Sequence, residues 1–183
     1  VTETILQTYT ASIDPCLLSG KFLVLHRILS SIRKHTQDRV IIVSNFTSTL
    51  NLLQRYCVRQ KFPFLRLDGR TKADVRSKMV NEFNSDTGSD HLGKQPFVFL
   101  LSSKSGGVGL NLIGANRLIL FDSDWNPATD RQAMARIHRD GQLKPCFIYR
   151  LLLVGSMDEK IYQRQITKIG LSDSLMSNEA AKD

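Results

Sequence analysis

The chain has 183 residues, of which 42% are apolar and 23% are charged, as in one soluble globular domain. Its longest apolar runs, at 97–101 and 151–154, are far too short to cross a bilayer, and its three widely spaced cysteines exclude a disulfide framework and favour a reducing compartment. Lysine and arginine number 25 against 17 acidic residues, a balance that fits a polyanionic partner and equally a basic domain without one.

The first half of the chain alternates between helical spacing and short continuous apolar runs. Continuous apolar runs are typical of strands that are buried on both faces of a sheet. In chain order we expect a helix capped by Ser19, a strand at 40–43, a helix that buries Leu50, Leu53 and Cys57, a strand at 64–67, and a helix capped by Thr71.

The second half continues the alternation after a polar, breaker-rich stretch at 84–96, which we interpret as a surface loop. We expect strands at 97–101 and 118–121, a helix opened by Asn126-Pro127 and ended by Gly141, a strand at 147–154, and a helix from Ser156 to about residue 169. The alternation predicts one α/β domain with a parallel β-sheet.

A glycine-rich segment, 101–112, follows the strand at 97–101, and its three glycines lie within four positions. Glycines let a backbone approach a ligand closely and point its N–H groups at an anion. The Rossmann pattern would need glycine where Leu112 stands, and Gly20-Lys21 is followed by Phe22, so it does not form a Walker A loop. A phosphate-facing loop and a plain strand-to-helix turn both remain open.

A second segment, 132–142, contains two arginines within a helical pattern. On a helix that continues to Gly141, Gln132, Arg136 and Arg139 fall at i, i+4 and i+7 and share one face. Neighbouring guanidinium groups repel one another unless an anion lies beside them, and their forked donors match phosphate oxygens. The pattern favours a phosphate-binding face over a solvated one.

Together the two segments resemble motifs V and VI of superfamily two helicases, in particular the Swi/Snf-type branch. The resemblance spans about 19–170 and includes the segments 40–46, 66–69 and 122–127. Within it, the segments 111–116 and 139–142 are most similar to recombination-repair translocases, which partner the strand-exchange recombinase. It implies a RecA-like α/β lobe, whose parallel β-sheet carries helices on both faces. Residues 1–18 would form a leader from the inter-lobe region, and 171–183 a frayed polar tail.

The resemblance also implies roles for residues at matching positions. Arg139 would be the arginine finger with Arg136 beside it, and the nucleotide would be approached by Gln132, Gly109 and Asn111. The backbone of double-stranded DNA would be contacted by Ser44, Asn45, Arg66, Gly69, Ser103, Lys104 and Trp125. Packing in the core or at an interface is the alternative for Trp125. A solvated basic stripe is expected at Lys160, Arg164 and Lys168, and the lobe would supply no metal ligand.

The chain begins at Val1 and lacks both the Walker A lysine and an Asp-Glu-x-His run, so we expect a fragment that is inactive alone. ATP with Mg²⁺ would be bound mainly by an N-terminal ATPase lobe of the same protein. The resemblance implies the second motor lobe of a nuclear, ATP-dependent DNA translocase in homologous recombination, DNA repair or chromatin remodelling, with a recombinase or chromatin as a further partner and no membrane. A lobe of a strand-separating helicase and a non-catalytic DNA-binding module are the alternatives.

Overall fold

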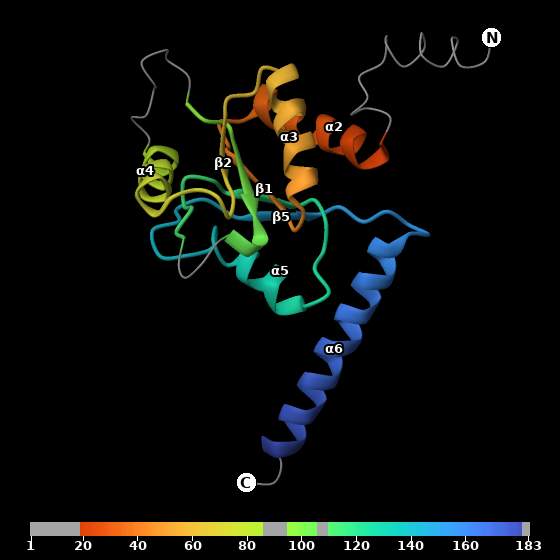
Figure 1. The fold of residues 1–183 in the computed structure, drawn as a ribbon. Helices are drawn as coiled ribbons and strands as arrows, with labels where there is room; N and C mark the ends of the chain where they lie inside the picture. The colour runs from red at the N-terminus through yellow and green to blue at the C-terminus, as the bar shows by residue number, and fades with distance from the viewer. Residues whose placement is uncertain (1–18, 86–94, 106–109, 181–183) are drawn as a thin grey trace, which may run out of the picture.

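The computed structural model describes the backbone of residues 19–85, 95–105 and 110–180, and the side chains of these residues as far as 170. Within them, five strands form one sheet in the order β2-β3-β1-β4-β5, and every neighbouring pair is parallel (Figure 1). The strands are β1 (Val40–Ser44), β2 (Phe64–Leu67), β3 (Val98–Ser102), β4 (Arg117–Leu120) and β5 (Phe147–Arg150). The predicted parallel sheet is confirmed.

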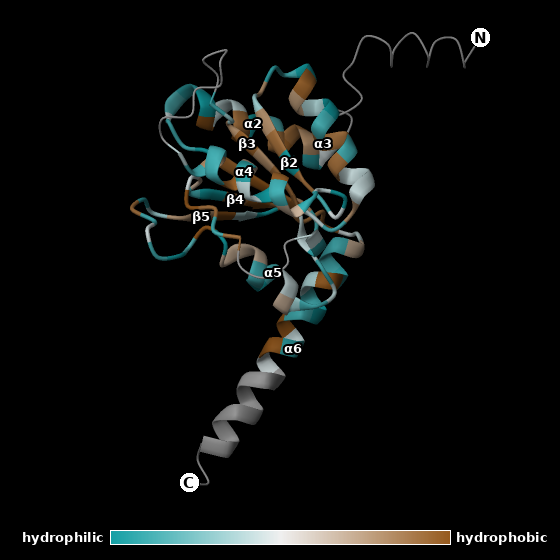
Figure 2. Ribbon diagram, turned by 60° about the vertical axis from the view of Figure 1, so that its left-hand side comes forward, coloured by the Kyte–Doolittle hydropathy of each residue, from teal (hydrophilic) through white to brown (hydrophobic). Residues whose placement is uncertain are grey.

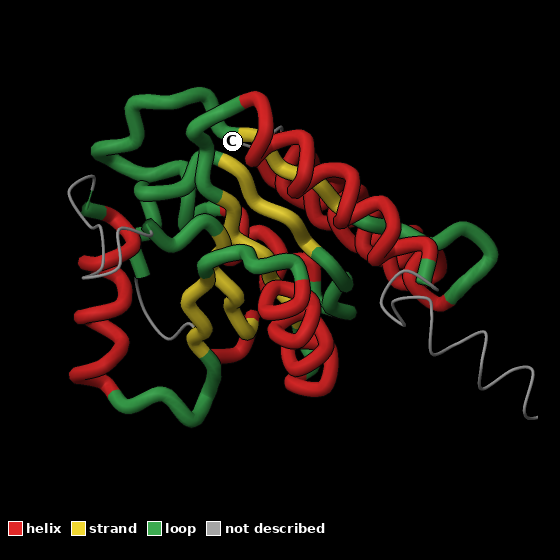
Figure 3. The backbone as a smooth tube through the Cα atoms, turned by 90° about the horizontal axis from the view of Figure 1, so that it is seen from above, coloured by secondary structure: helices red, strands yellow, loops and turns green. Residues whose placement is uncertain are grey.

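Helices cover both faces of this sheet. The helices are α2 (Gly20–His35), α3 (Thr47–Arg59), α4 (Ala73–Asn84), α5 (Pro127–Met134) and α6 (Met157–Ala180), with a 3₁₀ turn, η2, at Ser103–Ser105. One hydrophobic core joins α2 and α3 to one face, and a second joins α4 and α5 to the other. Figure 3 shows the strands lying between these helices.

Alternate residues of each central strand enter the two cores. In β1, Val40 and Ile42 pack against α2 and α3, whereas Ile41 and Val43 pack on the other face. Burial on both faces explains why this strand is a continuous apolar run in the sequence. Figure 2 shows the same arrangement, with hydrophobic strands inside and helices that are hydrophilic on their outer sides.

Several predicted boundaries differ from the structure. The N-cap of α4 is Lys72 rather than Thr71, because the Thr71 hydroxyl instead accepts a hydrogen bond from the Asp68 N–H at 3.2 Å and closes the turn after β2. Strand β5 ends at Arg150 rather than at 154, and α6 continues to Ala180 rather than ending near 169. The leader at 1–18 and most of the predicted loop, 86–94, lie outside the described residues.

None of the helices in the described ranges is long and apolar enough to span a membrane.

Candidate functional site

Most of the residues predicted to contact DNA lie where the strands end at their carboxyl termini. The strands are in register, with Val40 of β1 opposite Val98 of β3 and Arg117 of β4, so the loops that follow them emerge at one edge. The carboxyl edge of a parallel sheet is where open α/β folds bind ligands. Loops at this edge carry Asn45, Gly69, Ser103, Lys104 and Trp125.

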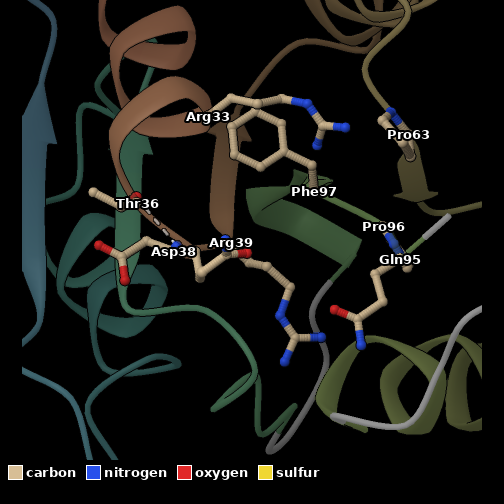
Figure 4. A pocket seen from close by; sticks show the side chains of 9 residues that line it. Arg33, Thr36, Asp38, Arg39, Pro63, Gln95, Pro96 and Phe97 are labelled. Atoms are coloured by element: carbon tan, nitrogen blue, oxygen red, sulfur yellow. Dashed lines mark hydrogen bonds between the residues drawn. The ribbon is translucent and has the colours of Figure 1, made fainter.

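A pocket of about 320 Å³ lies at the opposite edge, where the strands begin (Figure 4). Its carboxylate, Asp38, is bound by Arg117 Nε at 2.7 Å, and its Arg33 lies over the Phe97 ring at 5.1 Å. The charged groups of this pocket are therefore engaged within the fold, and the pocket contains none of the predicted site residues.

Asp122 connects three strand ends at the carboxyl edge. It is 8% exposed, and its carboxylate accepts hydrogen bonds from Ser44 Oγ at 2.5 Å and from the Asn45 N–H at 2.7 Å. Asn45 Oδ1 in turn accepts a hydrogen bond from Ser103 Oγ. Burial raises the pKa of Asp122, although the hydrogen bonds from Ser44 and Asn45 oppose this rise. The network places Asn45 beside Ser103. The hydroxyl of the fully buried Ser44 is already used in its hydrogen bond to Asp122.

Arg66 is largely engaged inside the domain. It points toward α3, where Nη1 donates to Asn51 at 2.8 Å and to Gln54 at 2.6 Å, while Nε and Nη2 donate to Asp68 at 3.1 and 2.9 Å. Four of the five guanidinium N–H groups are thus used. Arg66 is placed to hold the turn at the exposed Gly69, which leaves one N–H for an external phosphate.

The turn η2 exposes Lys104 to solvent and holds Ser105 inside the domain. Lys104 is exposed, whereas Ser105 is buried and its hydroxyl donates to Ser102 O at 3.0 Å. Arg76 Nη1 donates to Ser105 O at 3.0 Å and so ties the turn to α4. Gly109 lies outside the described residues.

The prediction of one helical face for Gln132, Arg136 and Arg139 is wrong. Helix α5 opens as expected, with Asn126 Oδ1 accepting from the Ala128 N–H at 3.1 Å, but it ends at Met134. Beyond that point the chain continues in tighter turns, so the helical spacing no longer applies. Arg136 is buried, whereas Gln132 and Arg139 are exposed.

Hydrogen bonds across the two segments hold the turns that follow α5. The Leu112 N–H donates to Arg136 O at 3.1 Å, and Gln142 Nε2 donates to Ala115 O at 2.8 Å and to Ile137 O at 3.2 Å. Carbonyl groups that a longer helix would bond internally are thus satisfied by partners from outside it. The same bonds fasten the segment after η2 to the arginine segment.

The two arginines still influence one another electrostatically. Burial lowers the pKa of Arg136, and the positive charge of Arg139 lowers it further. Arg139 Nε donates to Ala135 O at 3.3 Å, and the side chain remains exposed. Asn111 lies in the adjoining segment, and its buried Oδ1 has no hydrogen-bond partner among the described residues. The two arginines therefore concentrate positive charge beside Asn111, in the segment that leads into β4.

Trp125 lies on the surface of the loop after β4. It is 48% exposed, and the guanidinium of Arg164 from α6 lies 5.4 Å from the centre of its ring. Trp125 is therefore not a core residue. Arg164, which was expected only in a solvated stripe, covers one side of the ring.

Residues 20–141 match the family described as "Helicase conserved C-terminal domain". The chain belongs to this family. The RecA-like fold and the resemblance to the carboxyl-terminal lobe of Swi/Snf-type proteins are thereby confirmed. Use of a nucleotide follows at the level of the family.

Known relatives extend well beyond this helicase C-terminal domain. The chain is 55% identical to "Protein CHROMATIN REMODELING 25" of Arabidopsis thaliana, covering 84% of the chain and 16% of that protein. It is 52% identical to "DNA repair and recombination protein RAD54-like" of Homo sapiens, covering 88% and 21%. The chain thus spans about a fifth of the length of these curated relatives. A crystal structure of the C-terminal part of the Fun30 ATPase domain has a TM-score of 0.76 and 38% identity, covering 87% of this chain and 49% of that one.

Sequence reasoning assigned no role to several residues that hold the loops of this helicase C-terminal domain in place. The sequence did contain a signal that Asp122 belongs to the site, because it is a carboxylate placed directly after a buried strand. Asn84 had none, yet its Nδ2 donates to Asn111 O at 2.7 Å and its Oδ1 accepts from the Gly114 N–H at 2.9 Å. Gln142 was noted in the sequence only as part of the 132–142 segment. Its side chain bonds to Ile113 O and Ala115 O and so joins that segment to the one before β4.

Proposed function

We propose that the chain is the second motor lobe of an ATP-dependent double-stranded DNA translocase. The family match supports the assignment as a C-terminal lobe. The relatives named for DNA repair, recombination and chromatin remodelling support the biological process. Nuclear localisation and a recombinase or chromatin partner are part of the same proposal. The residue assignments below extend it to the chain's own side chains.

At the nucleotide, the lobe contributes positive charge rather than metal ligands. Arg136 and Arg139 lie within electrostatic reach of one another beside Asn111, which suits the phosphate end of a nucleotide. The described residues contain no cluster of three His, Cys, Asp or Glu side chains that could hold a metal ion. In this proposal Mg²⁺ is held mainly by the N-terminal ATPase lobe of the parent protein. Arg139, exposed on a tight turn, is the candidate finger for an ATP molecule bound across the two lobes.

At the DNA, the described part of the carboxyl edge offers polar groups that suit contacts to phosphates. Asn45 and Ser103 lie together, Lys104 is exposed beside them, and Gly69 lies on the neighbouring loop. Such groups position a protein on phosphates and carry no sequence information. This supports tracking along DNA of any sequence.

The observation that carries the proposal is the set of hydrogen bonds between the two motif segments. Leu112 N–H bonds to Arg136 O and Gln142 bonds to Ala115 O, so the segment that follows η2 in the chain is hydrogen-bonded to the arginine segment. A lobe that couples DNA contact to ATP hydrolysis needs such a link.

The test is Arg139→Ala in the full-length parent protein, with Arg27→Ala, an exposed arginine of α2, as the matched control. We expect DNA-stimulated ATP hydrolysis to fall about 10³-fold or more, since an arginine finger is worth roughly 10³–10⁵ in rate. DNA binding should change little. Weaker DNA binding with unchanged turnover per bound complex would instead identify Arg139 as a phosphate contact in a non-catalytic module.

A further inference from the structure

Helix α6 contacts the loop that carries Trp125 through two consecutive residues. Arg164 covers the Trp125 ring at 5.4 Å. Gln165 is 1% exposed, and its Nε2 donates to Asp124 O at 2.5 Å. The helix therefore holds the backbone of Asp124 and the side chain of Trp125 at once.

Gln165 also contacts α5 and β5. Its Nε2 donates to Asp130 Oδ2 at 2.9 Å, and its Oε1 accepts from Arg150 Nη1 at 2.7 Å. Asp130 is 3% exposed, and its other oxygen accepts from the Asp124 N–H at 3.2 Å. We call Asp124, Asp130, Arg150 and Gln165 the Gln165 junction. It joins α5, α6, the end of β5 and the loop after β4.

Packing alone does not explain an amide at this position. A buried polar side chain is costly unless its donors and acceptors are paired, and a leucine would fill similar space without that requirement. The amide of Gln165 has partners for both its nitrogen and its oxygen, on three different elements. A fully paired buried network of this kind fixes one relative placement of the elements that it joins.

We propose that Gln165 is a positioning residue that fixes the Trp125 loop and α5 relative to helix α6. Helix α6 is 24 residues long and runs away from the sheet (Figure 1). A displacement of α6 therefore acts on Trp125 and, through Asp130, on the helix that carries Gln132. The coupling belongs to this chain itself, and only its effect on DNA-stimulated hydrolysis rests on the proposed function.

The direct test uses the fluorescence of Trp125, because this is the only tryptophan in the chain. The variant is Gln165→Leu, and the matched control is Gln163→Leu at an exposed position of the same helix. We expect time-resolved anisotropy to show a larger fast component for Trp125 in Gln165→Leu and a decay like that of the unaltered chain in the control. Identical decays in both variants, with both folded by near-ultraviolet circular dichroism, would overturn the proposal.

A charge-swapped pair keeps the proposal testable if Gln165→Leu unfolds. Gln165→Glu places a second carboxylate against Asp130 and removes the N–H groups that Asp124 O and Asp130 accept. Pairing of the new carboxylate with Arg150 offsets only part of this loss, so Trp125 should become more mobile and the melting temperature should fall. Adding Asp130→Asn supplies an amide N–H to the new carboxylate, while the amide oxygen can still accept from the Asp124 N–H. We expect the double variant to recover much of the loss. A double variant as mobile as Gln165→Glu alone would contradict the proposal.

The parent protein gives the functional measurement. Gln165→Leu should raise the DNA concentration for half-maximal ATP hydrolysis several-fold, with a smaller effect on the rate at saturating DNA. An equal rise in Gln163→Leu would overturn the assignment. A parent without DNA-stimulated hydrolysis would overturn the proposed function, whereas the fluorescence comparison judges the Gln165 junction alone.

Discussion

Gly114 lies where the segment after η2 passes the end of α4, and it leaves no room for a side chain. A Cβ at this position would lie 2.2 Å from Phe83 O and 2.9 Å from Asn84 Cα. Both are backbone atoms of a helix, so they cannot swing aside as the tip of a side chain would. Gly114→Ala therefore requires the segment and the helix to separate by roughly 1 Å, since non-bonded heavy atoms pack at about 3.5 Å.

The cost of that separation follows from the contacts that it strains. Overpacking of this kind costs about 1–3 kcal/mol. The bonds from Gly114 N–H to Asn84 and from Asn84 to Asn111 O would lengthen, at about 0.5–1.5 kcal/mol each. The loss of backbone freedom in the unfolded chain offsets at most about 1 kcal/mol. We expect a net loss of about 3 kcal/mol, or roughly 10 °C in melting temperature for a domain of this size.

Thermal and urea denaturation of the 183-residue chain would measure this loss. Gly20→Ala is the matched control, because a Cβ there meets nothing within 4 Å, and it should leave stability unchanged or slightly raised. A Gly114→Ala variant as stable as the unaltered chain would refute the packing of this segment against α4, and with it the placement of Asn111.

Two further predictions concern the carboxyl edge. Because burial raises the pKa of Asp122 in the folded state, the folded chain takes up that proton more readily than the unfolded chain. The stability of the chain relative to Asp122→Asn should therefore rise as pH falls from neutral toward 4 in urea denaturation, and a constant difference would contradict the assigned burial. The basic chain should also bind double-stranded DNA weakly. If it neutralises two or more phosphates, its affinity should fall about tenfold or more between about 50 and about 200 mM salt. Salt-independent binding would contradict the phosphate contacts.

The sheet was predictable from the sequence because its central strands are buried on both faces. A continuous run such as 40–43 has one physical explanation in a chain that alternates with helical patterns. The start of α5 was predictable for a similar reason, since Asn126 caps it and Pro127 has the backbone angle of a first turn. Local chemistry decides these features, and local chemistry can be read from the residues.

The end of α5 was not predictable in this way. The chain beyond Met134 continues in turns in which Arg136 O accepts from the Leu112 N–H, a partner from a separate segment that comes close only when the domain folds. The internal hydrogen bonds of Ser44 and Arg66 were not predictable for the same reason, since their partners Asp122 and Asn51 come from other elements. Predicting which polar residues face a ligand requires knowing which are already paired inside the fold.

The most direct test that this chain is the second lobe of a two-lobe motor is ATP hydrolysis by the 183-residue chain. It is measured with and without double-stranded DNA, beside the full-length parent. A second lobe that supplies arginines and a DNA-facing edge, but neither the phosphate cradle nor the magnesium ligands, should hydrolyse ATP negligibly in both conditions. The parent should show strong stimulation by DNA. Robust DNA-stimulated hydrolysis by the pure 183-residue chain would contradict the account.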